Sequence, residues 1–255
     1  MKLRILGCSG GIGGPHSRTT AFLADDDILI DAGTGVGDLE LDALLRIDHV
    51  FVTHAHLDHI ASIPLLVDSV GELRNVPLTV YATAETIRIL HAHVFNWVIW
   101  PDFTAIPDRR QAYLRFHPIE VGETVRLGTR SITALPALHT VPAVAYCLDS
   151  GAGTLVYTGD TAFCAEQIAA INRLGELRHL IVETAFAEEQ HGLALAARHL
   201  CPSLLTAMLG ELAATPQVHV SHLKPGQSER IMRQLGTQGG RLRPALLEQG
   251  QVLEF

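Results

Sequence analysis

Short apolar runs separated by turn-forming residues dominate the first half of the chain. Runs bounded by Gly, Asp or Pro are typical of β-strands, whereas apolar residues spaced three and four apart indicate a helix. We therefore expect strands to come first and helices to follow them. The predicted strands are residues 3–6, 20–24, 28–30, a run ending near residue 53, and 78–82, and the predicted helices are residues 60–69 and 83–93.

The second half repeats this order, with a series of strands followed by alternating helices and strands. Strands are predicted at residues 112–116, 124–127, 131–135, 143–148, 154–158, 180–183 and 217–220, and helices at residues 165–174, 193–199, 203–212 and 227–235. Two such series predict two β-sheets packed together with helices outside. Because no linker or low-complexity tract interrupts the chain, residues 1–255 are interpreted as a single domain.

Two features of the first strands bear on a possible site. A Gly-rich loop at residues 7–15 could cradle a phosphate, but a strand follows it instead of a helix, which favours a tightly turning rim. Asp31 ends the third predicted strand. Its side chain is expected either to cap a turn or to support a metal-binding histidine by a hydrogen bond.

Composition narrows the function classes. The chain has 255 residues, 47% of them hydrophobic, which is enough material for one large core. Its net charge of −8 argues against a nucleic-acid binder, which needs basic patches to neutralise phosphates. Neither a signal sequence nor a membrane-length apolar run is present, and the four cysteines form no Cys-x-x-Cys pair. We therefore expect a cytoplasmic protein with reduced cysteines and no membrane partner.

The strongest chemical signal is a cluster of histidines directly after the fourth predicted strand. His54 and His56 alternate with small or apolar residues on an extended loop, and Asp58 and His59 stand in the first turn of the next helix. This arrangement directs four metal-binding side chains into one small volume. Imidazole nitrogen and carboxylate oxygen suit zinc. The alternative is a polar, His-rich turn that binds no metal.

Three more polar residues stand just past apolar runs, where a site between two sheets would collect them. His139 follows the strand at 131–135, Asp160 follows the strand at 154–158, and His222 follows the strand at 217–220. Taken singly, each would more often be a capped turn or a solvent-facing histidine. Together with the cluster they complete a set of seven candidate ligands, more than one tetrahedral zinc can use.

With this set the sequence resembles the metallo-β-lactamase fold superfamily. The resemblance implies a four-layer αββα sandwich with a dinuclear metal site, in which Asp58 and Asp160 also count as catalytic. Zn²⁺ is the expected metal, with Mn²⁺ or Fe possible. By this resemblance one metal is held by His54, His56 and His139, the other by Asp58, His59 and His222, and the two are bridged by Asp160.

Within that superfamily the chain is most similar to the class II 3′,5′-cyclic-nucleotide (cAMP) phosphodiesterases. The resemblance rests on the histidine motif at residues 54–62, an aromatic segment at residues 95–102, and the motif at residues 221–225. It implies hydrolysis of cyclic AMP or cyclic GMP to the 5′-monophosphate by a hydroxide bridging two metals. The aromatic segment holds both tryptophans, Trp97 and Trp100, which could stack on the base; a buried plug or a homodimer contact is the alternative.

Two further residues could serve the leaving group. Glu183 and His199 resemble the Glu and His that related tRNA 3′-processing nucleases place beside the scissile phosphate, although a strand-end cap and a helix-surface histidine would also explain them. Such a nuclease is the alternative enzyme, but the sequence shows no basic RNA-binding extension. A non-hydrolytic di-iron protein binding O₂ or NO is the alternative from another class. The expected partner is a small anionic phosphodiester.

Overall fold

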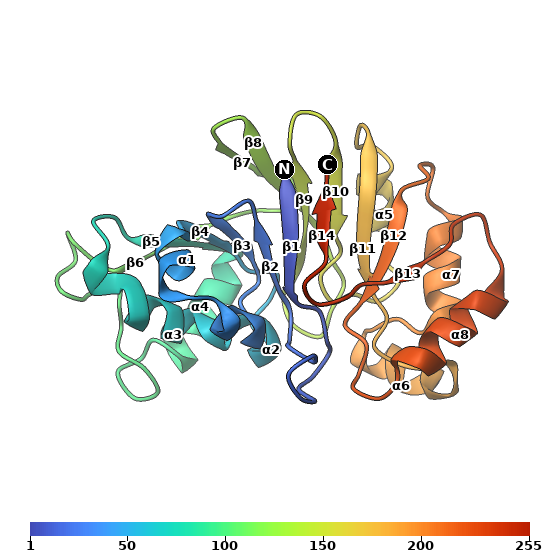
Figure 1. Cartoon of the computed structure of the whole chain (residues 1–255), viewed down its shortest axis with the longest axis horizontal. Helices are drawn as coiled ribbons and strands as arrows, with labels where there is room; N and C mark the ends of the chain where they lie inside the picture. Colours follow the sequence, from blue (N-terminus) through green and yellow to red (C-terminus); the bar gives the residue numbers. More distant parts are fainter.

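Two seven-stranded sheets form the centre of the computed structural model, which describes all 255 residues (Figure 1). In order across the first sheet lie β14 (Val252–Glu254), β1 (Lys2–Gly7), β2 (Ala21–Ala24), β3 (Ile28–Ile30), β4 (His49–Phe51), β5 (Leu78–Ala82) and β6 (Leu114–Pro118). In order across the second lie β13 (Ala245–Leu246), β12 (Gln217–Ser221), β11 (Leu177–Glu183), β10 (Thr154–Tyr157), β9 (Val144–Asp149), β8 (Arg130–Pro136) and β7 (Thr124–Leu127).

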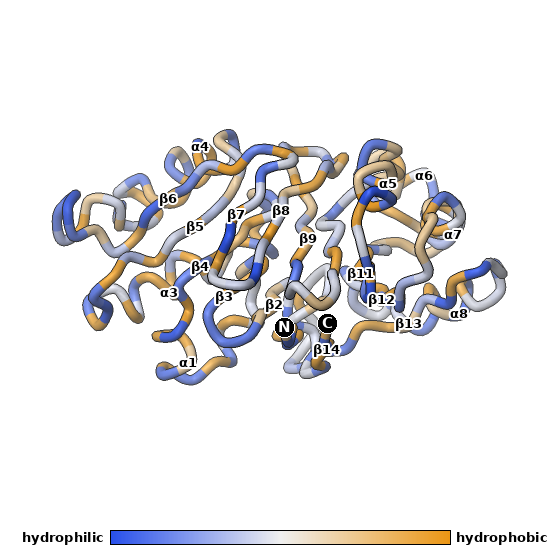
Figure 2. The backbone as a smooth tube through the Cα atoms, turned by 90° about the horizontal axis from the view of Figure 1, so that it is seen from above, coloured by the Kyte–Doolittle hydropathy of each residue, from blue (hydrophilic) through white to orange (hydrophobic).

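Helices cover the outer faces of both sheets, and in Figure 2 the helices of the first half lie toward the left and those of the second half toward the right. The helices of the first half are α1 (Leu41–Arg46), α2 (Leu57–Ile60), α3 (Ser62–Val70) and α4 (Ala84–His93). Those of the second half are α5 (Ala165–Ile171), α6 (His191–Ala197), α7 (Pro202–Gly210) and α8 (Ser228–Gln238). Short 3-10 helices span Thr34–Asp38, Gly71–Leu73 and Glu188–Gln190. This is the predicted αββα sandwich.

Alternation along the strands divides the core into three layers, because successive side chains of a strand point to opposite faces. In β3, Ile28 and Ile30 join the cluster between the two sheets, while Leu29 joins the cluster beneath α3. The cluster between the sheets also holds Tyr146 and Tyr157 of the second sheet. A third cluster lies between that sheet and α5, α7 and α8. Strands β2, β3 and β10 are buried on both faces, as their continuous apolar runs indicate.

The two ends of the chain pair with each other. Strand β14 runs antiparallel to β1 with Lys2 opposite Glu254, and the amino group of Met1 donates a hydrogen bond of 2.8 Å to the carbonyl of Phe255 (Figure 1). The sequence prediction missed β14, which has one buried residue in three. It also missed α1, a helix of six residues that buries none, because elements this short give a weak periodic signal.

The predicted helix at residues 60–69 is instead two helices, α2 and α3, that meet at Ala61. The amide of Ser62 bonds to the carbonyl of Ala32 at 2.9 Å, and the Ser62 hydroxyl donates to Gly33 at 2.7 Å. Pro64 has no amide proton to continue the helical ladder across the break. These bonds tie the start of α3 to the loop that follows β3, which fixes α2 and its two candidate ligands against the sheet.

Two findings concern the chain as a whole. No single helix is both long and apolar enough to cross a membrane; the segments Glu188–Ala197 and Pro202–Gly210 pass such a test only as a pair bent by 73°. All four cysteines are free thiols, as the sequence predicted.

Candidate active site

The seven candidate ligands come together at one edge of the sandwich. In the second sheet, β8, β10 and β12 run in the same direction, and His139, Asp160 and His222 follow their carboxyl ends. The loop after β4 and helix α2 supply the other four from the first sheet. Ligand sites in sheets with helices on their faces commonly lie at this edge, beyond the carboxyl ends of strands. The strand-end positions recognised in the sequence are therefore neighbours in space.

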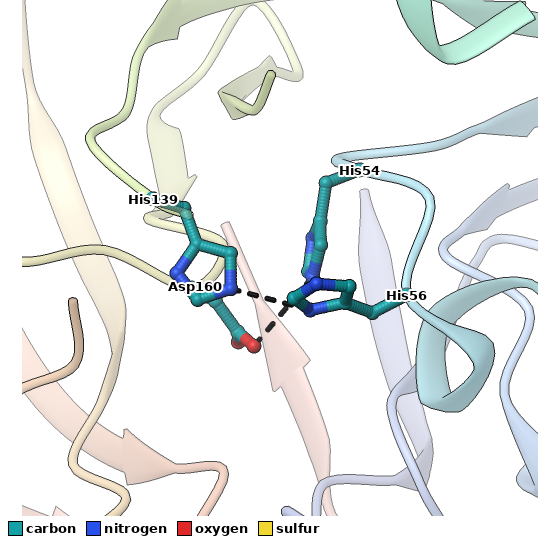
Figure 3. Close-up of side chains that lie close together, drawn as sticks. All are labelled: His54, His56, His139 and Asp160. Carbon is teal, nitrogen blue, oxygen red and sulfur yellow. Dashed lines mark hydrogen bonds and ion pairs between the residues drawn. The ribbon is translucent and has the colours of Figure 1, made fainter. Parts of the chain in front are cut away.

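The first group consists of His54, His56, His139 and Asp160 (Figure 3). One ligand atom from each lies within 4.8 Å of the others. His139 Nε2 is 3.3 Å from His56 Nδ1, and His54 Nε2 is 3.7 Å from a carboxylate oxygen of Asp160. The side chains of this group point toward a common centre, as a metal ion would require.

The second group consists of Asp58, His59, His222 and again Asp160, with ligand atoms within 4.8 Å of one another. His59 Nε2 lies 3.4 Å from Asp160 Oδ2, and His222 Nδ1 lies 3.3 Å from Asp160 Oδ1. Asp160 therefore belongs to both groups and presents one oxygen to His59 and the other to His222. Asp160 Oδ2 also lies 3.7 Å from His54 Nε2 of the first group, and the bridging role that the superfamily resemblance implies stays a prediction.

Several of these ligand atoms are buried without a hydrogen-bond partner. They are His54 Nε2, His59 Nε2, His222 Nδ1 and Asp160 Oδ1. An unpartnered buried polar atom is costly, and native structures keep few of them without a reason such as a bound ion. Four in one cluster, all from good metal-binding residue types, fit a pair of divalent metal ions.

The electrostatics of the cluster agree with that fit. Burial lowers the pKa of His139 to about 4 and of His222 to about 3, so both rings are neutral near pH 7 and keep a lone pair for a metal. Burial opposes the charge on Asp160, but His222 and His59 outweigh it and hold the pKa of the carboxyl well below its usual range. The cluster therefore places the ionised carboxylate of Asp160 beside the neutral rings of His139 and His222.

Asp31 fixes the orientation of His59. Its carboxylate accepts hydrogen bonds from the Thr53 amide at 2.7 Å, the Thr53 hydroxyl at 2.8 Å and His59 Nδ1 at 2.7 Å, entirely out of solvent. The bond to Nδ1 leaves Nε2 of His59 as the lone-pair nitrogen facing Asp160. Asp31 thus has the supporting role predicted for it. Thr53, which sequence reasoning did not single out, also contacts His54 Nδ1 at 3.0 Å.

Glu183 and His199 form a buried pair beside the candidate ligands. His199 Nδ1 lies 2.7 Å from Glu183 Oε1, and its ring stacks on His222 at a centroid distance of 5.4 Å. Burial lowers the pKa of His199, but the hydrogen bond to Glu183 outweighs this and raises it. The predicted helix at 193–199 instead ends at Ala197, so His199 follows the helix and is only 8% exposed. The interpretation of His199 as a histidine on a helix surface is therefore wrong.

Arg198 was missed by sequence reasoning. It adopts a left-handed conformation with φ of 54° at the end of α6, where a non-glycine residue is uncommon. Its guanidinium donates to the carbonyl of His139 at 2.6 Å, and His139 Nδ1 donates to the Arg198 carbonyl at 3.1 Å. These reciprocal bonds hold His139 in place. In the sequence Arg198 stands beside His199, and nothing there indicates its contact with the distant His139.

The Gly-rich loop lies against His222. The His222 amide donates to Cys8 at 2.7 Å, and the Gly10 amide donates to Leu223 at 3.0 Å. A Cβ at Gly10 would lie 2.4 Å from the His222 carbonyl, so only glycine fits this approach. The loop is the tightly turning rim that the sequence predicted, and it helps to hold His222 in its left-handed conformation, with φ of 59°.

The aromatic segment divides into a buried and an exposed part. Phe95 and Phe103 are buried in the cluster beneath α3 and α4, and Trp100 packs against that cluster. Trp97 is 64% exposed and stands beside exposed Val98. Part of the segment is thus core, one of the two alternatives considered, while stacking of Trp97 or Trp100 on a base stays a prediction.

Comparisons with known proteins agree with the fold. The sequence-family model described as the beta-lactamase superfamily domain matches residues 26–242. A probable 3′,5′-cyclic-nucleotide phosphodiesterase of Yersinia pestis is 31% identical over 119 residues, covering 45% of this chain and 33% of that protein. A 3′,5′-cyclic-nucleotide phosphodiesterase of Aliivibrio fischeri is 28% identical over 252 residues, covering 81% of this chain and 74% of that protein.

Among solved structures, unliganded yeast PDE1 superimposes with a TM-score of 0.83 at 18% identity, covering 100% of this chain and 99% of that one. This likeness establishes the fold, and the match of the family model extends over most of the chain. The chain therefore belongs to the family of proteins with a beta-lactamase superfamily domain.

Proposed function

We propose that this protein is a metal-dependent phosphodiesterase that hydrolyses 3′,5′-cyclic nucleotides to 5′-monophosphates. The observation that carries the proposal is the pair of four-residue groups that share Asp160. The relatives named as cyclic-nucleotide phosphodiesterases support the choice of substrate. The matched part of the chain covers a third of the first relative's length and three quarters of the second's. Hydrolysis of cyclic nucleotides by this chain is therefore a proposal.

The proposed cofactor is a pair of divalent metal ions, with zinc favoured by the histidine and carboxylate donors and manganese or iron also compatible. One ion would be held by His54, His56 and His139, the other by Asp58, His59 and His222, and Asp160 would contact both. When bound, such a pair supplies an activated water at neutral pH and positive charge beside the phosphate.

Glu183 and His199 are proposed to protonate the leaving oxygen. Because His199 Nδ1 is bonded to Glu183, Nε2 is the ring nitrogen left to carry a proton to substrate. Glu183 is itself held by the amides of Thr161 at 3.1 Å, Ala185 at 3.1 Å and Leu200 at 3.2 Å. As the bond between phosphorus and the 3′ oxygen breaks, the proton would pass from His199 to that oxygen.

A small substrate is favoured over a polynucleotide by charge. The chain carries 19 Lys and Arg against 27 Asp and Glu, which does not provide the basic surface that RNA binding needs. Two locally bound cations would still attract a single phosphodiester.

A substrate panel tests the proposal. Purified protein loaded with zinc or manganese is incubated with cyclic AMP, cyclic GMP, bis-p-nitrophenyl phosphate and a tRNA precursor, and products are separated by chromatography. The expected product is the 5′-monophosphate from a cyclic nucleotide. Intact cyclic nucleotides with cleavage of the tRNA precursor would assign a nuclease. A visible absorption band in the protein as purified, before metal loading, together with no hydrolysis, would assign the di-iron alternative.

A further inference from the structure

A groove of about 450 Å³ adjoins the candidate metal centre on the side of His139, which lines it. The loop between β8 and β9 forms one wall, and Val121 and Arg198 lie at its edge. Its volume falls within the range of small-molecule sites. His139 Nε2 also lies 3.3 Å from His56 Nδ1, so the groove and the metal-ligand cluster share this histidine.

The surface of the groove is apolar over one part and cationic at another. Val121, Leu138, Val141 and Pro142 line it, and Val121 and Leu138 are 55% and 41% exposed. No acidic side chain is among the lining residues, although the chain as a whole carries a charge of −8. An apolar surface of this kind, with few polar groups and one guanidinium, suits a flat ring such as a nucleobase.

The groove is already held in shape. The Leu138 amide donates to the Thr161 hydroxyl at 3.1 Å, and the Leu138 carbonyl accepts from Ala162 at 2.8 Å. Arg198 is fixed by its bond to the His139 carbonyl, which uses one nitrogen of the guanidinium. The rest of that planar group can contact a ligand, and guanidinium planes stack well on aromatic rings.

We propose that this groove binds the nucleoside part of the substrate, with the base against Val121 and Leu138 and the Arg198 guanidinium beside it. The inference rests on the proposed function, because the phosphate of a cyclic nucleotide must lie at the metal ligands and the nucleoside must then occupy an adjoining concavity. The groove meets this requirement because the candidate ligand His139 lines it.

Val121→Glu tests this, since it places charge and bulk in the groove from a loop that bears no candidate ligand. The expected result is a KM for cyclic AMP raised by about 10-fold or more, with a smaller rise for bis-p-nitrophenyl phosphate because a nitrophenyl ring is smaller than a nucleoside. Binding of adenosine 5′-monophosphate, measured by calorimetry, should weaken by a similar factor. Val121→Ala, which only shortens the apolar wall, should act in the same direction by less.

The matched control is Val252→Glu, the same substitution at a valine of similar exposure, 48%, on edge strand β14. It should change neither substrate's kinetics, and thermal unfolding of all variants verifies folding. An equal effect of Val121→Glu on both substrates, or none on either, would overturn the groove assignment. So would a raised KM on Trp97→Ala without one on Val121→Glu. Wild-type protein that cleaves bis-p-nitrophenyl phosphate but no cyclic nucleotide would instead overturn the proposed function.

Discussion

Replacing Asp31 by asparagine should weaken metal binding without unfolding the protein. The left-handed backbone at Asp31, with φ of 56°, is one that asparagine tolerates, and the two side chains have the same shape. The asparagine oxygen can still accept from the Thr53 amide. Its NH₂ group then replaces the carboxylate oxygen that accepts from the Thr53 hydroxyl and from His59 Nδ1.

A donor in that position reverses the tautomer of His59. Nδ1 must then accept a hydrogen bond, so the proton moves to Nε2, the nitrogen that faces Asp160 and would bind metal. Loss of such a partner typically lowers metal affinity by about 10- to 100-fold, which corresponds to about 1.4–2.8 kcal/mol. Because the effect passes through His59, only the group that contains this histidine should weaken.

The assay is competition between the protein and a chelator for zinc, with both binding steps resolved. Asp31→Asn should weaken one step by the stated factor and leave the other close to wild type, and nitrogen-15 shifts of the histidine rings should report the new tautomer. Asp48→Asn, at a half-exposed carboxylate paired with Arg74, is the control and should change neither step. Unchanged zinc affinity in Asp31→Asn would refute the assignment of Asp31 as the residue that orients His59.

Three other substitutions probe separate parts of the account. Asp160→Ala should reduce metal content, measured by plasma mass spectrometry, and abolish phosphodiesterase activity; a fully active variant would contradict its shared position. His199→Asn, whose amide can keep the bond to Glu183, should lower kcat on cyclic AMP by about 10²–10⁴ while metal content stays intact. The loss of kcat should be smaller on a nitrophenyl ester, and equal losses on both substrates would count against His199 as a proton donor. Burial and then His179 lower the pKa of His219 to about 4 from 6.5, so the unfolded chain takes up a proton first as the pH falls. Between pH 7 and pH 5 the free energy of unfolding, measured by urea unfolding, should therefore fall more in wild type than in His219→Gln, by at most about 2 kcal/mol. Parallel pH profiles of the two proteins would exclude this contribution of His219.

Much of the architecture is predictable because it depends on local patterns. Apolar runs and their punctuation located β5 at Leu78–Ala82 and α4 at Ala84–His93. All seven candidate ligands could be named because they follow strands whose ends meet at one edge. The features that the apolar pattern could not predict depend on contacts between distant segments. Pro64 marks the break between α2 and α3 in the sequence, but the bond between Ser62 and the carbonyl of Ala32 that positions α3 is not visible there.

The same limit applies within the site. His199 was placed on a helix because its neighbours have helical spacing, yet its bond to Glu183 and the left-handed Arg198 draw it out of the helix and bury it. The clamp between Arg198 and His139 joins residues 59 positions apart. Asp31 was recognised as either a turn cap or a supporting residue, and only the fold decides between them by bringing His59 within 2.7 Å.

The central claim is that two metal ions held by these seven residues carry the phosphodiesterase activity. Metal-free protein, titrated with zinc while cyclic AMP hydrolysis is followed and bound metal is counted, tests it most directly. We expect no activity at the start and a rate that rises to a plateau at two ions per chain, because two four-residue groups share Asp160. Full activity with one ion or none would contradict it.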